Sequence, residues 1–196
     1  MGVFAAMATV CEKLWGEASV AGRRVLVQGT GSVGGPLIEK LLAAGAIVSF
    51  RDVAEAAVKR FDGRGLPFVP PDAVFDAACD VVAPGALGGV LNADTIPRLR
   101  CRAVVGAANN QLATPADAER LRDLGILYGP DFVVNAGGAI AITGQESLGW
   151  SAERAADEVV RIGETLERVL DIAATLGIST DAAARRLAEE RLTAGR

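Results

Sequence analysis

A glycine-rich loop between an apolar strand and a helix constrains this chain more than any other feature. The segment VLVQGTGSVGGPLIEKLLAAG places Gly29, Gly31 and Gly34 in the spacing GxGxxG. In such a loop the first glycine allows a tight turn, the second lets the backbone approach a pyrophosphate, and the third lets the helix pack against the strand. A helix starting near Ser32 and Val33 would offer free N–H groups to phosphates. The loop therefore predicts dinucleotide binding, with a purely structural glycine turn as the alternative.

An acidic residue follows the loop at the distance that dinucleotide-binding folds use for the adenosine ribose. A second apolar run, Ala46–Arg51, leads to Asp52, eighteen positions beyond Gly34. A carboxylate there would accept hydrogen bonds from ribose hydroxyls and repel a 2′-phosphate, which favours NAD over NADP. Arg51 keeps an alternative open, because its guanidinium could bind a 2′-phosphate or simply face solvent. NAD is therefore the expected cofactor and NADP the second choice.

The pattern of the whole chain is that of a parallel α/β protein. Short apolar strands alternate with helices of roughly ten residues, which predicts a doubly wound Rossmann-type sheet. One helix is well marked, because Thr114 can cap it, Pro115 can take its first position and Gly125 follows its last turn. The predicted strands are Arg24–Gln28, Ala46–Arg51, Phe68–Val69, Asp80–Ala83, Ala103–Ala107 and Ile126–Tyr128, and helices are predicted over Val33–Ala44 and Ala54–Phe61.

Helices flank this core at both ends of the chain. Apolar residues recur at spacings of three and four over 3–15, and again from a Ser151 cap to about Leu176, followed by a last helix over 181–192. We expect one dinucleotide-binding domain over 1–196, made of a leading helix (1–20), a Rossmann core (21–148) and a C-terminal helical appendage (149–196).

Composition excludes several classes of function. The chain is 51% hydrophobic but only 5% aromatic, so the core must be closely packed Val, Leu, Ile and Ala. A net charge of −4 argues against a nucleic-acid partner. Three widely spaced cysteines, Cys11, Cys79 and Cys101, predict buried thiols in a reducing cytoplasm and neither a disulfide framework nor a metal site. We see no apolar run long enough to span a membrane and no secretory signal.

Loops rich in small residues follow three of the predicted strands. Ligands of open α/β sheets lie outside the carboxyl ends of the strands, where the segments 81–89, 104–111 and 128–140 would meet. Asn109, Asn110 and Asn135 in these loops can each donate and accept hydrogen bonds, as a nicotinamide carboxamide requires. The alternative is that they cap turns and helices, and the residues alone do not decide between the two.

These loops resemble a known family. The segments CDVVAPGALGGVLN, VVGAANNQLATP and ILYGPDFVVNAGG, with the opening MGVFAAM and the terminal AAARRLAEERL, are similar to the cofactor domain of the leucine, phenylalanine and valine dehydrogenases. Relatives often carry cysteine where Gly85 stands. The resemblance implies pyrophosphate contacts by Gly29, Gly31, Ser32 and Val33, adenosine-ribose contacts by Asp52, nicotinamide-side contacts by Ala83, Pro84 and Gly85, ribose contacts by Ala107, Ala108 and Asn109, and a place for Asn135 beside nicotinamide and substrate.

The resemblance also implies which chemistry is missing. In this family the catalytic lysines and aspartate lie in a substrate domain. None of Lys13, Lys40 and Lys59 lies in a segment that resembles the family's catalytic lysine motif, and the chain has no histidine. Deamination of an amino acid should then be greatly impaired, whereas a preformed imine could still accept hydride. We expect an oxidoreductase acting on such a small molecule, with Asn135 orienting the reactants. The alternatives are a non-catalytic NAD-binding module, a cofactor subunit that needs a partner chain, and a remnant without function, which the clean apolar strands argue against.

The opening helix and the helix near 152–176 lead to one further expectation. In the full enzymes these helices pack beside the substrate domain, so their apolar stripes should here be exposed and drive self-association, most simply as a homodimer, or binding of a partner chain.

Overall fold

The structure, a computed structural model that describes residues 1–194, is built on a parallel sheet in the order β2-β1-β3-β4-β5. Neighbouring strands are parallel throughout, and the register aligns Val27 of β1 with Phe50 of β2 and with Ala83 of β3. The strand order therefore reverses between β1 and β3. The strands are β1 (Arg24–Gln28), β2 (Ile47–Arg51), β3 (Val81–Pro84), β4 (Ala103–Val104) and β5 (Leu127–Tyr128).

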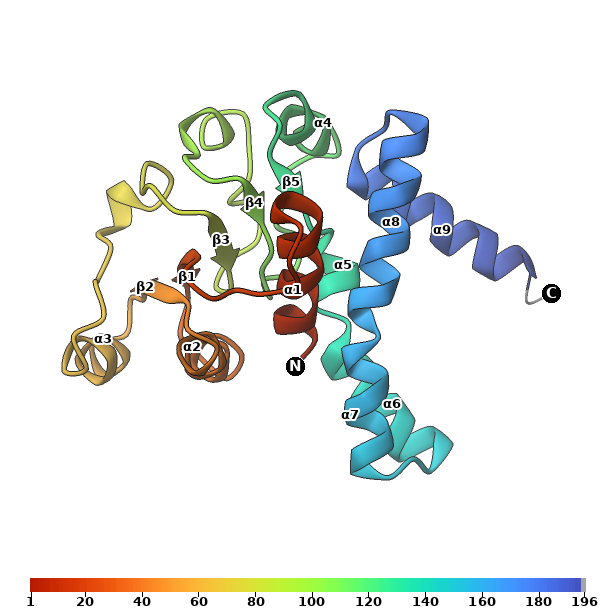
Figure 1. Cartoon of the computed structure of the whole chain (residues 1–196), viewed down its shortest axis with the longest axis horizontal. Coiled ribbons are helices and arrows are strands. Elements are labelled where there is room, and N and C mark those ends of the chain that lie inside the picture. Colours follow the sequence, from red (N-terminus) through yellow and green to blue (C-terminus); the bar gives the residue numbers. More distant parts are fainter. Residues whose placement is uncertain (195–196) are drawn as a thin grey trace.

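Helices cover both faces of this sheet and extend beyond one edge (Figure 1). The predicted doubly wound α/β class is confirmed. The α-helices are α1 (Gly2–Trp15), α2 (Gly34–Ala43), α3 (Glu55–Asp62), α4 (Ala116–Asp123), α5 (Asp131–Val134), α6 (Gly137–Leu148), α7 (Ala152–Val160), α8 (Ile162–Leu176) and α9 (Thr180–Ala194), with 3₁₀ turns η1 (Pro71–Ala73) and η2 (Ile96–Arg98).

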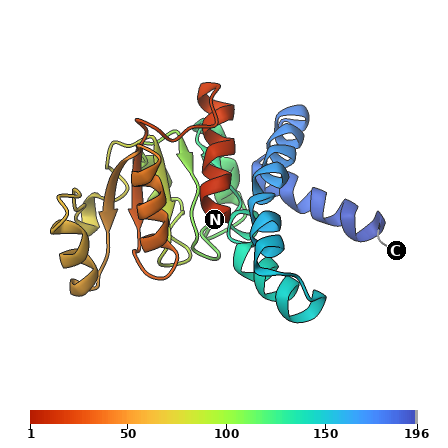
Figure 2. The same cartoon turned by 60° about the horizontal axis from the view of Figure 1, so that its bottom comes forward.

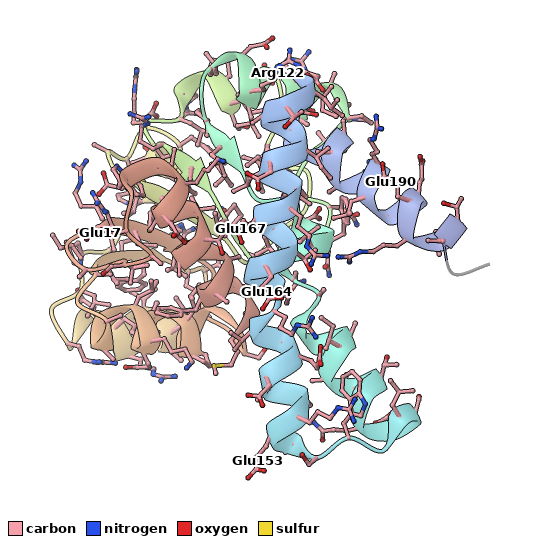
Figure 3. The ribbon with its side chains drawn as sticks, turned by 45° about the vertical axis from the view of Figure 1, so that its right-hand side comes forward. Glu17, Arg122, Glu153, Glu164, Glu167 and Glu190 are labelled. Atoms are coloured by element: carbon pink, nitrogen blue, oxygen red, sulfur yellow. The ribbon has the colours of Figure 1, made fainter. Side chains whose placement is uncertain are left out.

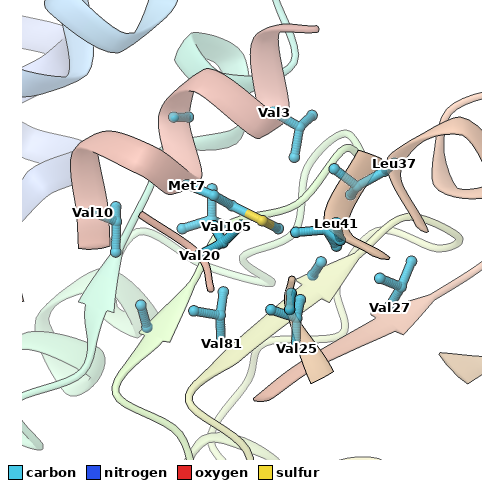
Figure 4. Packing of buried hydrophobic residues seen from close by; sticks show 14 of the residues in the cluster. Val3, Met7, Val10, Val20, Val25, Val27, Leu37, Leu41, Val81 and Val105 are labelled. Carbon is cyan, nitrogen blue, oxygen red and sulfur yellow. The ribbon is translucent and has the colours of Figure 1, made fainter. Parts of the chain in front are cut away.

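Burial on both faces explains why the strands read as continuous apolar runs. Along β1, Val25 and Val27 enter one core cluster while Leu26 enters another on the opposite face. In the first cluster, Val3 and Met7 of α1 and the leucines of α2 pack over the strands (Figure 4). The second cluster contains η2 and α4 residues. The central residues of β1 are therefore buried whichever way they point, as expected for a sheet covered on both faces.

Two predicted strands and one predicted helix cap need correction. Phe68 forms only an isolated bridge with Phe50, so no strand occupies 68–69. The predicted Ala103–Ala107 strand stops at Val104, because the chain turns there over the end of β3, where the N–H of Ala108 donates to the carbonyl of Pro84 at 2.9 Å. At α4 the Thr114 hydroxyl does not cap the helix but donates to Asp117 at 2.8 Å.

The C-terminal quarter also differs from its prediction. The expected long helix is divided at Arg161 into α7 and α8, whereas Ser151 does cap α7 by accepting from the N–H of Arg154 at 3.2 Å. The short helix α5 and the apolar helix α6 were not anticipated. Helix α6 lies beside α7, away from the sheet. Helix α9 projects from the body (Figures 1 and 2).

The apolar stripes that we expected to be exposed are buried within the chain. Residues such as Met7 and Val10 of α1 and Leu166 and Val169 of α8 are fully buried, because α8 packs along α1. The solvent face of α8 instead carries Glu164 and Glu167 (Figure 3). Exposed apolar side chains lie elsewhere. On α6 and α9 they are Ile142, Leu148 and Leu192, which are 59%, 59% and 71% exposed.

The three cysteines are free and buried, as predicted. Burial raises the pKa of the Cys79 thiol to about 11 and that of Cys101 to about 12, so both stay protonated near neutral pH.

Candidate functional site

The glycine loop closes tightly where β1 leads into α2. Gly29 has a φ of +90°, and a side chain there would meet the backbone of Gly85 at 3.0 Å. A Cβ at Gly34 would lie 1.9 Å from the carbonyl oxygen of Gly29, so the first turn of α2 packs directly on the loop. Gly31 is different, because a Cβ there would meet nothing within 4 Å. The loop therefore has two glycines required by packing and one that borders open space.

The start of α2 borders the same space. Val33 is the N-cap, and no side chain within residues 1–194 caps the helix. Gly31, Ser32 and Val33 are exposed. Because the first N–H groups of a helix lack intrahelical partners and carry its positive dipole end, this is a suitable place for an anion such as a pyrophosphate.

Asp52 lies beside the loop, immediately after β2. Its Oδ2 accepts from the N–H and the hydroxyl of Thr30, both at 2.6 Å, and its Oδ1 accepts from the N–H of Ala54 at 2.8 Å. Burial tends to raise the pKa of Asp52, but the Thr30 hydroxyl and the N–H groups of Ala54, Thr30 and Val53 outweigh it and hold the pKa below its ordinary value. Asp52 is therefore an anion fixed in place by the loop.

Arg51 lies next to this carboxylate, and its guanidinium lies 5.6 Å from the centre of the Phe68 ring. A second guanidinium, that of Arg60, comes within 3.9 Å of a Cβ built on Gly35 in the first turn of α2. The sequence pattern did not single out Arg60. Arg51 thus faces Phe68, and Arg60 pairs with Glu39 at 3.5 Å.

The loops after β3 and β4 form the opposite side of the site. Ala83, Pro84 and Ala108 are buried, so only their backbones can face a ligand, whereas Gly85 and Asn109 are exposed. The N–H of Gly85 donates to the carbonyl of Gln28 at 2.6 Å, and a Cβ at Gly85 would lie 2.9 Å from the same oxygen. Glycine at position 85 thus permits a close approach to β1.

A buried glutamine also holds this side together. The side-chain amide of Gln111 donates to the carbonyls of Gly106 and Ala108 at 3.0 and 2.9 Å, which fixes the turn that presents Ala107. Its Oε1 accepts no hydrogen bond within residues 1–194, as is true of Gln28. Gln111 is not among the residues predicted from the sequence. It ends a run of three polar residues that follows an apolar strand, and this run was a usable signal. In the structure Gln111 is fully buried.

Two of the three candidate asparagines meet. The side-chain amide of Asn135, at the C-terminal end of α5, donates to Oδ1 of Asn109 at 2.8 Å. Asn110 instead has a φ of +51°, and its carbonyl accepts from Gly89, so it serves the loop. Asn110 therefore serves a turn, whereas Asn135 is the C-cap of α5 and also pairs with Asn109.

A cavity of about 400 Å³ connects Asn135 with the start of α2. It lies between α1, α2, α6 and α7, and Asn135, Gln145 and Lys40 bring polar groups to it. Lys40 is exposed, as expected for a surface residue, yet it also lines this cavity. Ser32 and Val33 line the cavity at the glycine loop, and most of the remaining lining is apolar or glycine.

A metal centre needs clustered ligand side chains, and a membrane span needs a long apolar helix. Within residues 1–194 there is no group of three or more acidic or cysteine side chains arranged to hold a metal ion. Across the same residues, every helix is too short or too polar to cross a bilayer.

Comparison with known proteins decides the family. The family model for Glutamate/Leucine/Phenylalanine/Valine dehydrogenase matches residues 47–194. The chain belongs to this dehydrogenase family. The resemblance inferred from the loops after the strands is thus confirmed.

The relatives agree in sequence and structure. A leucine dehydrogenase of Thermoactinomyces intermedius is 40% identical over 97% of this chain, and a valine dehydrogenase of Streptomyces virginiae is 42% identical over all of it. The crystal structure of L-tryptophan dehydrogenase from Nostoc punctiforme superposes with a TM-score of 0.92 and 39% identity, covering 98% of this chain and 59% of that one. The chain spans about half the length of the curated relatives it matches, 52% and 55% of these two.

Proposed function

We propose that the chain is an NAD-dependent oxidoreductase that transfers hydride to or from an amino-acid-derived imine or a similar small molecule. The observation that carries the proposal is the open cavity between Asn135 and the glycine loop. A binding module without a reaction would have no use for an accessible space beside the proposed nicotinamide position, whereas a substrate needs one.

The residues present suit a dinucleotide. Gly31 leaves room where a pyrophosphate would approach, the uncapped start of α2 provides N–H groups at Ser32 and Val33, and Asp52 is anionic beside them. Gly29 and Gly34 shape the loop, and Arg51 borders the ribose position. The proposed nicotinamide side consists of Ala83, Pro84, Gly85, Ala107, Ala108, Asn109 and Asn135. The nicotinamide, when bound, supplies the hydride chemistry.

The chain's own contribution is to bind and orient. The Asn135 amide is fixed by Asn109, so one carboxamide face can position the nicotinamide or the substrate. Amides such as Asn135 and Gln145 cannot transfer protons at neutral pH. A substrate that arrives as an imine needs little acid–base assistance, whereas oxidative deamination needs a base to activate water.

One observation favours a second candidate function. The polar side chains of the cavity are the Ser32 hydroxyl, two amides and the exposed Lys40, so a buried general acid or base would have to come from elsewhere. On this alternative the chain is a non-catalytic NAD-binding module, or a cofactor subunit whose partner chain supplies a catalytic lysine.

Nucleotide binding is tested by calorimetric titration of NAD and NADP into the parent and Asp52→Ala. We expect the parent to bind NAD more tightly and Asp52→Ala to lose that preference, because the carboxylate both accepts from ribose hydroxyls and repels a 2′-phosphate. Equal or tighter NADP binding by the parent would contradict the assignment and point to Arg51.

The reaction is tested by following reduced-nicotinamide absorbance. We expect the 196-residue chain alone not to deaminate leucine, valine or phenylalanine measurably, since general acid–base groups contribute roughly 10²–10⁴-fold each. We expect it to reduce a preformed cyclic imine, and Asn135→Ala to slow that reduction. Rapid deamination would show that another group replaces the lysine. Cofactor binding without turnover of any imine would favour the second candidate.

Self-association or a partner chain is proposed on a different surface from the one first expected. Helix α6 leaves the apolar side chains of Ile142 and Leu148 each 59% exposed, and large exposed apolar side chains on one helix are a candidate interface. We expect Ile142→Glu to dissociate a dimer in light scattering at micromolar concentration. Ile47→Glu, 58% exposed at the start of β2, is the matched control. A monomeric parent would contradict the homodimer.

A further inference from the structure

The carboxylate of Asp52 is already engaged by the protein. Each carboxylate oxygen offers about two acceptor positions. Oδ2 accepts from both the N–H and the hydroxyl of Thr30, each at 2.6 Å, so its positions are filled. Oδ1 accepts from the N–H of Ala54 at 2.8 Å. At most one position remains, on Oδ1, for a ribose that offers two hydroxyl groups.

The two donors of Thr30 have different roles. The backbone N–H belongs to the glycine loop and would be present with any residue other than proline. The hydroxyl is a property of the side chain, and Thr30 is 6% exposed, so its orientation is fixed by packing. Together the backbone N–H and Ala54 can hold the carboxylate in place without the hydroxyl. The hydroxyl therefore takes an acceptor position from Asp52 and is not needed for its orientation.

The electrostatic surroundings act in the same direction. Three hydrogen-bond donors, the N–H and hydroxyl of Thr30 and the N–H of Ala54, partly neutralise the charge of Asp52. A carboxylate satisfied in this way repels a 2′-phosphate less strongly than a free one.

We propose that Thr30 is a specificity-determining residue that limits how strongly Asp52 selects NAD over NADP, because its hydroxyl occupies the acceptor position that a second ribose hydroxyl would use. This inference rests on the proposed dinucleotide binding. The site of the parent protein would therefore prefer NAD over NADP only moderately. Removing the Thr30 hydroxyl would increase that preference.

The test compares Thr30→Ala with the parent and with Thr30→Ser by calorimetry with NAD and NADP. Alanine removes the hydroxyl and leaves its place open to a ribose hydroxyl, and serine keeps the hydroxyl. We expect Thr30→Ala to bind NAD roughly threefold to tenfold more tightly and NADP no more tightly, so that the ratio of the two dissociation constants rises by that factor. Thr30→Ser should keep the parent's ratio. Thermal unfolding of all three proteins reports their folding separately.

The outcomes separate the two proposals. A parent that binds neither dinucleotide would overturn the proposed function and this inference together. A parent that binds NAD, combined with a folded Thr30→Ala variant whose ratio is unchanged or lower, would overturn only the role of Thr30 and make its hydroxyl a structural brace. If Thr30→Ala does not fold, Thr30→Gly replaces it, with the same expected change in the ratio.

Discussion

The two sides of the candidate site are held in place by different interactions. At the glycine loop, backbone atoms set the geometry: the N–H of Gly29 donates to the carbonyl of Arg51 at 2.7 Å, and Gly34 packs on the oxygen of Gly29. On the amide side, the hydrogen bond of 2.8 Å between Asn135 and Asn109 joins two exposed side chains. The first side belongs to the core, and the second lies at its margin.

This difference indicates which side of the candidate site is already ordered before a ligand binds. Backbone positions fixed by close packing cost little further ordering when a ligand binds, whereas exposed side chains lose rotamer freedom. We therefore expect the glycine loop to provide most of the affinity and the asparagine pair to provide orientation. Each of the following variants tests one part of that division.

The largest effect is expected at the glycine loop. Gly34→Ala should destabilise the protein by about 3 kcal/mol or more, because the new Cβ would lie 1.9 Å from the carbonyl oxygen of Gly29. Gly31→Ala should change stability by less than about 0.5 kcal/mol, since nothing lies within 4 Å, yet weaken NAD binding at least about tenfold. Urea unfolding and calorimetry measure the two effects. Equal loss of stability in both variants would erase the distinction between the packed and the open glycine.

A smaller effect is expected at the asparagine pair. Asn109→Ala and Asn135→Ala should each cost about 1 kcal/mol or less, with a coupling of similar size in the double-mutant cycle, because one exposed hydrogen bond contributes little to stability. Asn135→Ala should slow imine reduction more than it weakens NAD binding. If it instead abolished NAD binding with the fold intact, the asparagine pair would supply affinity and the proposed division would be wrong.

The smallest effect concerns pH and Asp52. Its folded-state pKa is lowered, so its contribution to stability is present above the unfolded pKa of about 3.9 and is lost as pH falls through the folded value. The stability difference between the parent and Asp52→Asn should therefore be about 1 kcal/mol or less near pH 7 and disappear on acidification, because solvent screens a partly exposed group. Unfolding curves between pH 7 and pH 3 measure it. A difference that grew toward acid would reverse the sign of the proposed interaction.

The parts of the fold that depend on local pattern were readable from the sequence. The strand β1 was predicted with its observed bounds, because a strand buried on both faces is a continuous apolar run, and α2 followed from the punctuation around it. By contrast, Phe68 occurs in an apolar pair but gains only one bridge, since strand pairing depends on the partner strand. Helix α6 was missed because its glycines and apolar residues show no helical periodicity.

The sequence by itself determined the parallel sheet, the glycine loop and the family, because these depend on spacing along the chain and on residues whose backbone freedom is fixed by type. The tertiary structure alone decided that α1 and α8 bury each other's stripes, that Asn135 meets Asn109 across 26 positions, and that the Thr30 hydroxyl engages Asp52. The physical reason is that a hydrogen bond or a packed interface depends on distances between segments remote in sequence. Residue type limits which partners are possible, and only the folded arrangement selects one of them.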